Sequence, residues 1–296
     1  MSAATNLPDL SGLDSKALMK LESEIAEQFM GGVPWGSVTW ALANLAVWLA
    51  LWPLTFMHIL PLWAAFPIAT ACVALGYLPS HEAQHDIIAR PGTPLRWLNQ
   101  LIGHVSTIPL LLPYSVAKLT HMEHHKHTNH PELDPDIHTK ADNSLQFLIN
   151  SIASRQPNGR GNRTYSEALA RLGTPDVMRA QLEALAMQLA YLAILFTAAW
   201  TGHAIEAALL WWLPKHLAQT YIGYYLSWAP HHPAKETGRY RDTRGFKSLV
   251  GNIGSMGMQF HIIHHLHPRI PLMRTPKAYW AMRPILEARK CDLSGL

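Results

Sequence analysis

HEAQHD, at residues 81–86, stands at the end of a long apolar stretch and allows two chemically distinct interpretations. Its first five letters match H-E-x-x-H, a helical pattern in which two histidines one turn apart hold zinc and the glutamate acts as a base. His81, Glu82 and His85 would then form the centre of a membrane zinc protease. Alternatively, the two histidines form one corner of a larger imidazole cage for two metal ions. The other histidines of the chain decide between these interpretations.

The composition is typical of a membrane protein with sizeable water-exposed parts. Of the 296 residues, 49% are hydrophobic and 15% charged, and the mean hydropathy is +0.02. Cys72 and Cys291 lie far apart and predict neither a disulfide framework nor a cysteine metal site. The net charge of +4 is not gathered with aromatic residues in one patch, which excludes nucleic acid as the expected partner and favours a membrane surface.

Four apolar stretches have lengths suited to crossing a hydrocarbon core, which requires about 20 helical residues. They are residues 36–56, 62–78, 183–202 and 206–228. Short turns join them in pairs, so we expect an all-α integral membrane protein with four transmembrane helices in two hairpins. Residues 1–35 would form a cytoplasmic N-terminal segment and residues 36–296 the membrane domain, with a histidine-rich cytoplasmic cap made of residues 79–182 and 229–296.

Two hairpins return the chain to its starting side, so both termini and the middle region share one aqueous face. Lys and Arg concentrate on this face and are almost missing from the two short turns, which makes it cytoplasmic by the positive-inside rule. We expect no signal peptide. In a bacterium the chain would lie in the inner (plasma) membrane. Within the middle region, RQPNGRGNR at residues 155–163 predicts a flexible loop.

Histidine is frequent, with 18 copies, and it is clustered. HMEHH at 121–125 and HIIHH at 261–265 lie on the same expected face as the first motif. Positions i, i+3 and i+4 project from one side of a helix, so the three motifs offer imidazoles to a common point. Together they supply His81, His85, His121, His124, His125, His261, His264 and His265. A single catalytic zinc uses three protein ligands and leaves most of these unexplained, whereas two metals of higher coordination number use them all.

At these motifs the sequence resembles the membrane-bound fatty acid desaturase family, whose three histidine boxes are matched by HEAQH, HMEHH and HIIHH over about residues 36–275. The resemblance implies two non-haem iron ions, O2 as co-substrate and oxidative attack on C–H bonds of a membrane lipid. APHHP at 229–233 resembles the position of a further metal-side histidine; His231 is the preferred ninth ligand and His232 its competitor.

The resemblance also points to side chains that would orient the ligating imidazoles through their second N–H. HTNHPELDPD at 127–136 is similar to the stretch after the second box in desaturases and carotenoid ketolases, and Asp86 follows the first box. The candidates for this role are His127, His130, Asp134, Asp136 and Asp86.

Within this class the preferred activity is that of a fatty acyl desaturase, with a carotenoid hydroxylase or ketolase, or a lipid hydroxylase, as the alternative. The HExxH protease is less favoured because Glu206, the acid of the fourth span, lies at the opposite end. A metal transporter or storage protein is a third hypothesis. The chain has no haem or iron–sulfur motif, so the resemblance implies a separate electron donor of the ferredoxin or cytochrome b5 type, docking on the basic cytoplasmic face.

Lys215 and His216 lie inside the fourth apolar stretch. A charge at this depth is costly, and such residues face protein or a water-filled cavity. A role in substrate binding or gating and a packing role are both compatible with the sequence.

Overall fold

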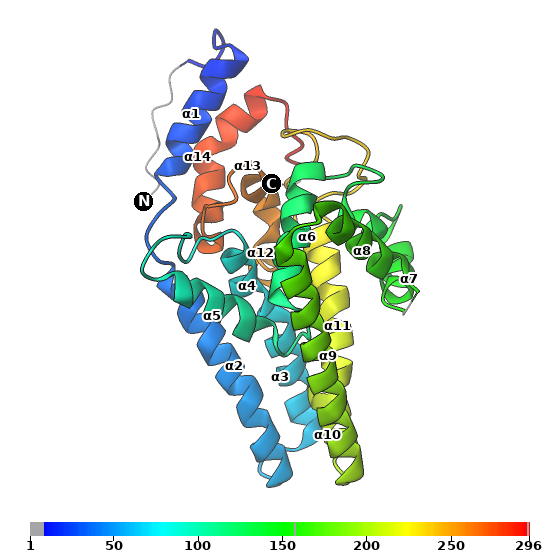
Figure 1. The fold of residues 1–296 in the computed structure, drawn as a ribbon. Helices are drawn as coiled ribbons and strands as arrows, with labels where there is room; N and C mark the ends of the chain where they lie inside the picture. Colours follow the sequence, from blue (N-terminus) through cyan, green and yellow to red (C-terminus); the bar gives the residue numbers. More distant parts are fainter. Residues whose placement is uncertain (1–8, 157, 295) are drawn as a thin grey trace.

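The computed structural model describes residues 9–156, 158–294 and 296, and in these residues all regular structure is helical. Figure 1 shows two parts: long helices that extend together toward one end, and shorter helices gathered at the other. The expectation of an all-α chain is confirmed.

In the part of the chain that the structure describes, three helices are long and apolar enough to cross a membrane. They are α2 (Trp35–Phe56), the continuous helix Leu62–Gln84 and α9 (Pro175–Trp200), with 22, 23 and 26 residues. The second consists of α3 (Leu62–Leu75) and α4 (Tyr77–Gln84), so the first histidine motif extends a membrane-type helix directly. Three of the four expected apolar stretches therefore appear as long helices.

The fourth stretch is a run of short helical segments instead of one regular helix. α10 (Ala204–Ala207) leads into the π-helix η2 (Ala208–Trp212), then α11 (Leu213–Ile222) and the π-helix η3 (Gly223–Trp228). Pro214 has no N–H for the carbonyl four residues earlier, that of Leu210. The indole of Trp48 on α2 donates to this carbonyl at 3.0 Å, so a neighbouring helix compensates for the break.

The remaining helices gather at the end that carries the histidine motifs (Figure 1). They are α1 (Ser15–Glu27), α5 (Arg96–Thr107), α6 (Tyr114–His127), η1 (Pro135–Thr139), α7 (Ser144–Ser154), α8 (Arg160–Leu172), α12 (Gly251–Gly254), η4 (Met258–Phe260), α13 (His261–Leu266), η5 (Leu272–Arg274) and α14 (Thr275–Ala288). A second hydrophobic core joins α1, α13 and α14 through residues such as Ile25, Ile263 and Tyr279. The two ends of the described chain are thus packed around the third histidine motif.

The loop expected at residues 155–163 is shorter than predicted. α7 ends at Ser154 and α8 begins at Arg160, so the last four residues of that stretch, 160–163, are helical. α8 forms because Ala168 and Leu169 bury one side of an otherwise polar helix, and this amphipathic pattern outweighs the turn residues at its start.

Candidate metal centre

The first histidine motif faces the second across the junction of the two parts. His81 lies on α4 and His85 caps its end, one turn later. The Nε2 atoms of His81 and His85 lie 3.0 and 2.8 Å from Nε2 of His121 on α6.

The third motif closes the cluster. His264 on the short helix α13 places Nε2 at 3.1 Å from Nε2 of His125, which in turn lies 3.1 Å from Nε2 of His121. The three motifs, which are far apart in the sequence, therefore bring their imidazoles to one point.

The potential ligand atoms fall into two groups. In each group they lie within 4.8 Å of one another: His81, His85, His121 and His264 form the first group, and His124, His231 and His265 the second. His125 lies between the groups, because it contacts His121 and its ring centre is 4.2 Å from that of His265. The ring of His261 lies 4.7 Å from that of His265, beside the second group.

The donor set fits metal ions better than it fits hydrogen bonds. Nε2 of His121 has three other Nε2 atoms within 3.1 Å. A ring nitrogen offers either one proton or one lone pair, so it cannot pair with all three. Within the described residues, Nε2 of His231, His261 and His265 is buried without a hydrogen-bond partner.

Burial and the closeness of neighbouring histidines also lower the pKa of several of these imidazoles well below the usual value. They include His121, His125, His264 and His265. Neutral imidazoles carry the free lone pair that a transition metal binds, so these four histidines can accept a metal at neutral pH.

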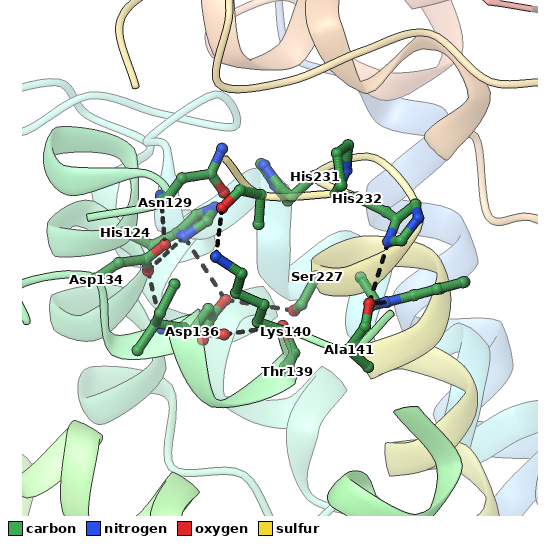
Figure 2. A pocket seen from close by; sticks show the side chains of 14 residues that line it. His124, Asn129, Asp134, Asp136, Thr139, Lys140, Ala141, Ser227, His231 and His232 are labelled. Carbon is green, nitrogen blue, oxygen red and sulfur yellow. Dashed lines mark hydrogen bonds and ion pairs between the residues drawn. The ribbon is translucent and has the colours of Figure 1, made fainter. Parts of the chain in front are cut away.

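A buried carboxylate orients His124. Its Nδ1 lies 2.8 Å from Oδ1 of Asp134, and Asp136 is farther away at 3.9 Å (Figure 2). Although burial opposes protonation, the carboxylates of Asp134, Asp136 and Asp242 raise the pKa of His124 to about 9. Asp134 is itself fixed, since the backbone N–H groups of Asn129 and Asp136 donate to it. A carboxylate on the outer nitrogen of an imidazole fixes its tautomer and increases its basicity toward a metal.

His231 and His232 point in different directions (Figure 2). His231 is buried, donates from Nδ1 to the Asp242 carbonyl at 2.9 Å, and places Nε2 in the second group. The ring of His232 packs against Trp228 and its Nδ1 lies 3.2 Å from the carbonyl of Ala141. Only His231 joins the other histidines.

The remaining candidates for orienting residues lie elsewhere. The carboxylate of Asp86 forms ion pairs with Arg96 and with Lys118, the latter at 2.5 Å, and not with a histidine. His127 lies 3.7 Å from Glu123, and Nδ1 of His130 accepts backbone N–H groups of its own loop. Asp136 accepts a hydrogen bond from Tyr165 at 2.7 Å. Among all five residues that the sequence suggested for orienting an imidazole, Asp134 alone lies within hydrogen-bond distance of a histidine of the three motifs.

Glu82 is turned away from the histidines. Its Oε1 accepts the backbone N–H of Leu272 at 2.6 Å, and the side chain is buried. A metalloprotease base must reach the water on the metal, and this carboxylate instead anchors the start of η5. The structure therefore supports the larger imidazole cage over the zinc protease.

Two contributors to the site carry no recognisable signal in the sequence. The side-chain amide of Asn129 donates to the carbonyls of Glu236 and Asp242 at 2.8 and 2.9 Å. Asp242 acts through its backbone carbonyl on His231, and any residue type offers a carbonyl. These bonds tie the loop after the second motif to the loop after the fourth apolar stretch.

Comparison with known proteins agrees with this geometry. The family model described as fatty acid desaturase matches residues 57–292, most of the chain. The chain therefore belongs to the fatty acid desaturase family, a family of oxidoreductases of lipid metabolism, and the resemblance at the three histidine motifs is confirmed.

Relatives within the family have different activities. The chain is 24% identical over 259 residues to the sn-1 acyl-lipid omega-3 desaturase (ferredoxin) of Nostoc sp. (strain 36), an alignment that covers 76% of this chain and 69% of that protein. It is 35% identical over 74 residues to an sn-1 oleoyl-lipid 12-desaturase of Anabaena variabilis, covering 25% and 21%. It is 26% identical over 211 residues to the zeaxanthin 4-ketolase of Chlamydomonas reinhardtii, covering 68% and 40%.

Proposed function

We propose that this chain is an oxygen-dependent di-iron fatty acyl desaturase of a membrane lipid. The observation that carries the proposal is the convergence of the three histidine motifs and His231 into two neighbouring groups of ligand atoms. One iron would be held by His81, His85, His121 and His264, and the other by His124, His231 and His265. His125 would lie between them and His261 beside the second.

The iron pair would supply oxygen-dependent oxidation of an unactivated C–H bond. The chain supplies the surroundings for that chemistry. Asp134 holds the His124 ring in one orientation, and the carbonyl of Asp242 does the same for His231. The histidines are mostly buried, so bulk water is kept from the reacting carbon. Whether a methylene loses a second hydrogen or gains a hydroxyl depends on its placement.

The long apolar helices favour a substrate that enters the site from the bilayer.

We propose four spans in two hairpins, with the run from Ala204 to Trp228 as the fourth, and residues 1–35 before a membrane domain of residues 36–296. Both termini and the cap would lie in the cytoplasm, at the inner membrane if the source is bacterial. Cysteines introduced at Gly202 and at Glu236 test this topology. A membrane-impermeant thiol reagent added outside intact cells should label the first alone.

A separate ferredoxin or cytochrome b5 type donor would deliver the electrons. The names of several relatives specify ferredoxin, which supports such a donor. Activity in purified protein should depend on adding the donor and its reductase, and activity without either would contradict this part.

Product analysis decides between substrates. The chain should be expressed in a host that makes both acyl lipids and carotenoids, and its lipid extract examined for new double bonds. Keto or hydroxy carotenoids without new double bonds would favour the alternative activity, which the ketolase relative suggests. About two irons per chain are expected, and one zinc with peptidase activity would refute the proposal. Chelator-sensitive iron uptake without oxygen consumption would indicate a transporter.

A further inference from the structure

A large apolar cavity lies beside the membrane helices, outside the histidine cluster. Its volume is about 1320 Å³, and its walls come from α3, α7, η2, α11, η3 and α12. Aromatic and aliphatic side chains dominate the lining, among them Phe66, Phe147, Trp212 and Tyr225. Ordinary small-molecule sites measure roughly 300–1,000 Å³, so this cavity has room for a lipid chain.

Two walls of the cavity lead toward the histidines. Leu75 lines it and lies six residues before His81 in one continuous helix, about 9 Å along the axis at about 1.5 Å per residue. Tyr225 also lines the cavity, six residues before His231. A chain lying in the cavity would therefore approach the candidate metal centre.

Helix α7, one of the helices that border the cavity, has an apolar outer surface. Leu145, Leu148, Ile149 and Ile152 on α7 lie on one side at helical spacing, with exposed fractions of 67%, 42%, 59% and 52%. A contiguous exposed apolar surface marks contact with a membrane or partner. In a chain with three membrane-type helices, lipid is the neighbour that this surface fits, so an occupant would reach the cavity from the bilayer.

Two cations, Arg155 and Lys215, and the imidazole of His216 lie at or beside this apolar cavity. Arg155 and His216 line it. The Arg155 guanidinium donates to the hydroxyls of Thr220 at 2.8 Å and Ser151 at 3.0 Å, which are neutral. Lys215 does not line the cavity, but it precedes His216 directly in α11. Its Nζ lies 5.1 Å from the ring centre of Tyr191.

These cations lack a counter-charge. Among the ion pairs of the described residues, none involves Arg155, Lys215 or His216, and the undescribed positions include no Asp or Glu. Half-buried charges in apolar surroundings are unfavourable unless an opposite charge compensates them. An anion in the cavity would provide that charge.

We propose that Arg155 and His216, assisted by Lys215, bind the anionic oxygen group of a lipid whose acyl chain lies in the cavity. The group is a phosphate or a carboxylate, since both match a guanidinium. This inference rests on the proposed function, because it names the substrate as an anionic acyl lipid. A neutral carotenoid would leave the cations uncompensated.

Lipid retention by the purified, iron-loaded full-length protein tests the site without turnover. The protein is equilibrated with phosphatidylcholine vesicles that contain phosphatidylglycerol, oleate, a galactolipid or β-carotene, and the retained lipid is measured by mass spectrometry. The anionic lipids should be retained preferentially. Arg155→Gln should weaken their binding by about tenfold to a hundredfold, because a charge-assisted hydrogen bond is lost. Arg155→Lys should restore part of it.

Two further variants separate the contribution of charge to lipid retention from the contribution of cavity volume. Arg163→Gln removes an exposed cation on α8, outside the cavity, and should leave retention unchanged. Ala71→Phe fills part of the cavity without changing charge and should reduce retention of every lipid that uses it. In the wild-type protein, added salt should weaken retention of anionic lipid and spare the galactolipid.

Retention of phosphatidylglycerol alone would identify the group as a lipid phosphate, and retention of oleate alone as a carboxylate. Equal retention of neutral and anionic lipids, unaffected by Arg155→Gln or by salt, would overturn the proposal. If that result came with new double bonds in the host lipids, the proposed function would stand without this site. Selective retention without any oxidised lipid would support the site and contradict the proposed function.

Discussion

The hydrogen bond between Asp134 and His124 is the one that matters most to the candidate metal centre. Asp134→Asn removes the negative charge beside Nδ1 of His124, so that imidazole becomes less basic and less well oriented. Changing an orienting carboxylate of this kind typically lowers metal affinity about 10- to 100-fold. Iron titration of the purified variant should show that loss.

Asp142→Asn is the matched control, since Asp142 is an exposed carboxylate of the same region. Its iron affinity should equal that of the wild type. Equal affinities for both variants would show that Asp134 does not support a ligand.

Glu82 separates the two interpretations of the first motif. Glu82→Gln retains a carbonyl oxygen that can accept the N–H of Leu272, so we expect a loss of about 1 kcal/mol in stability and continued lipid oxidation. A zinc protease would lose its base and with it its activity. Product analysis of the variant beside the wild type makes the distinction, and complete loss of oxidised lipid in a folded, iron-loaded variant would contradict our assignment.

At the scale of residues, the sequence pointed to the motif histidines and to His231 in preference to His232, but it held no physical reason for that preference. The spacing of the histidines within each motif determines which imidazoles share a helix face, and this spacing can be read directly from the amino-acid sequence. Adjacent histidines differ only in direction. The Asp242 carbonyl and the Trp228 ring set that direction, and both are tertiary contacts.

At the scale of elements, a buried carboxylate fastens α1 to the rest of the cap. Glu22 accepts hydrogen bonds from Arg239 and Tyr240 at 3.0 Å each, and lies 2.9 Å from Nε2 of His267 and 3.7 Å from Arg289. Glu22→Gln should lower the free energy of unfolding by about 3 kcal/mol, because it leaves the buried Arg289 and the half-buried Arg239 without their charged partner. Thermal melting measures this, with the exposed Glu24→Gln on the same helix as control.

The same carboxylate gives the cap a defined acid sensitivity. Burial opposes ionisation, but the bonds from His267 and Arg239 prevail and lower the pKa of Glu22 from its ordinary value of 4.5. A group with a lowered folded-state pKa stabilises the fold fully above the unfolded value and loses that contribution as pH falls through the folded value. Melting temperatures measured downward from about pH 4.5 should therefore fall more steeply for the wild type than for Glu22→Gln. Parallel curves would contradict this role.

Elements were predictable where one property dominates a long stretch. Three apolar stretches appear as long helices because about 20 apolar residues leave few alternatives. α7 was not predicted, because its 11 residues lie within a region whose average is polar, and its apolar side becomes apparent only when the helix is known. The π-helical segments flank α11: η2 packs against α3, and η3 packs against α7 and η1. The sequence alone does not report these contacts.

At the scale of the whole molecule, bound metal should contribute to stability as well as to chemistry. Ligands that bind only the folded state add about 2.7 kcal/mol when present at 100 times their Kd. Iron chelation should therefore lower the melting temperature, and ferrous iron should restore both stability and lipid oxidation. Zinc should restore stability alone, since it has no redox chemistry. A melting temperature indifferent to chelation would mean that the imidazoles do not hold metal.

Helix α6 supplies His121 to one group of ligands and His124 to the other, while His125 touches both. Because one helix carries ligands of both groups, it cannot rotate or slide to suit one ion without displacing the ligands of the other ion. The two metal sites should consequently fill and empty together, and protein that holds only one ion should be scarce. A helix of 14 residues thereby makes the pair, and not the individual ion, the unit that this protein assembles.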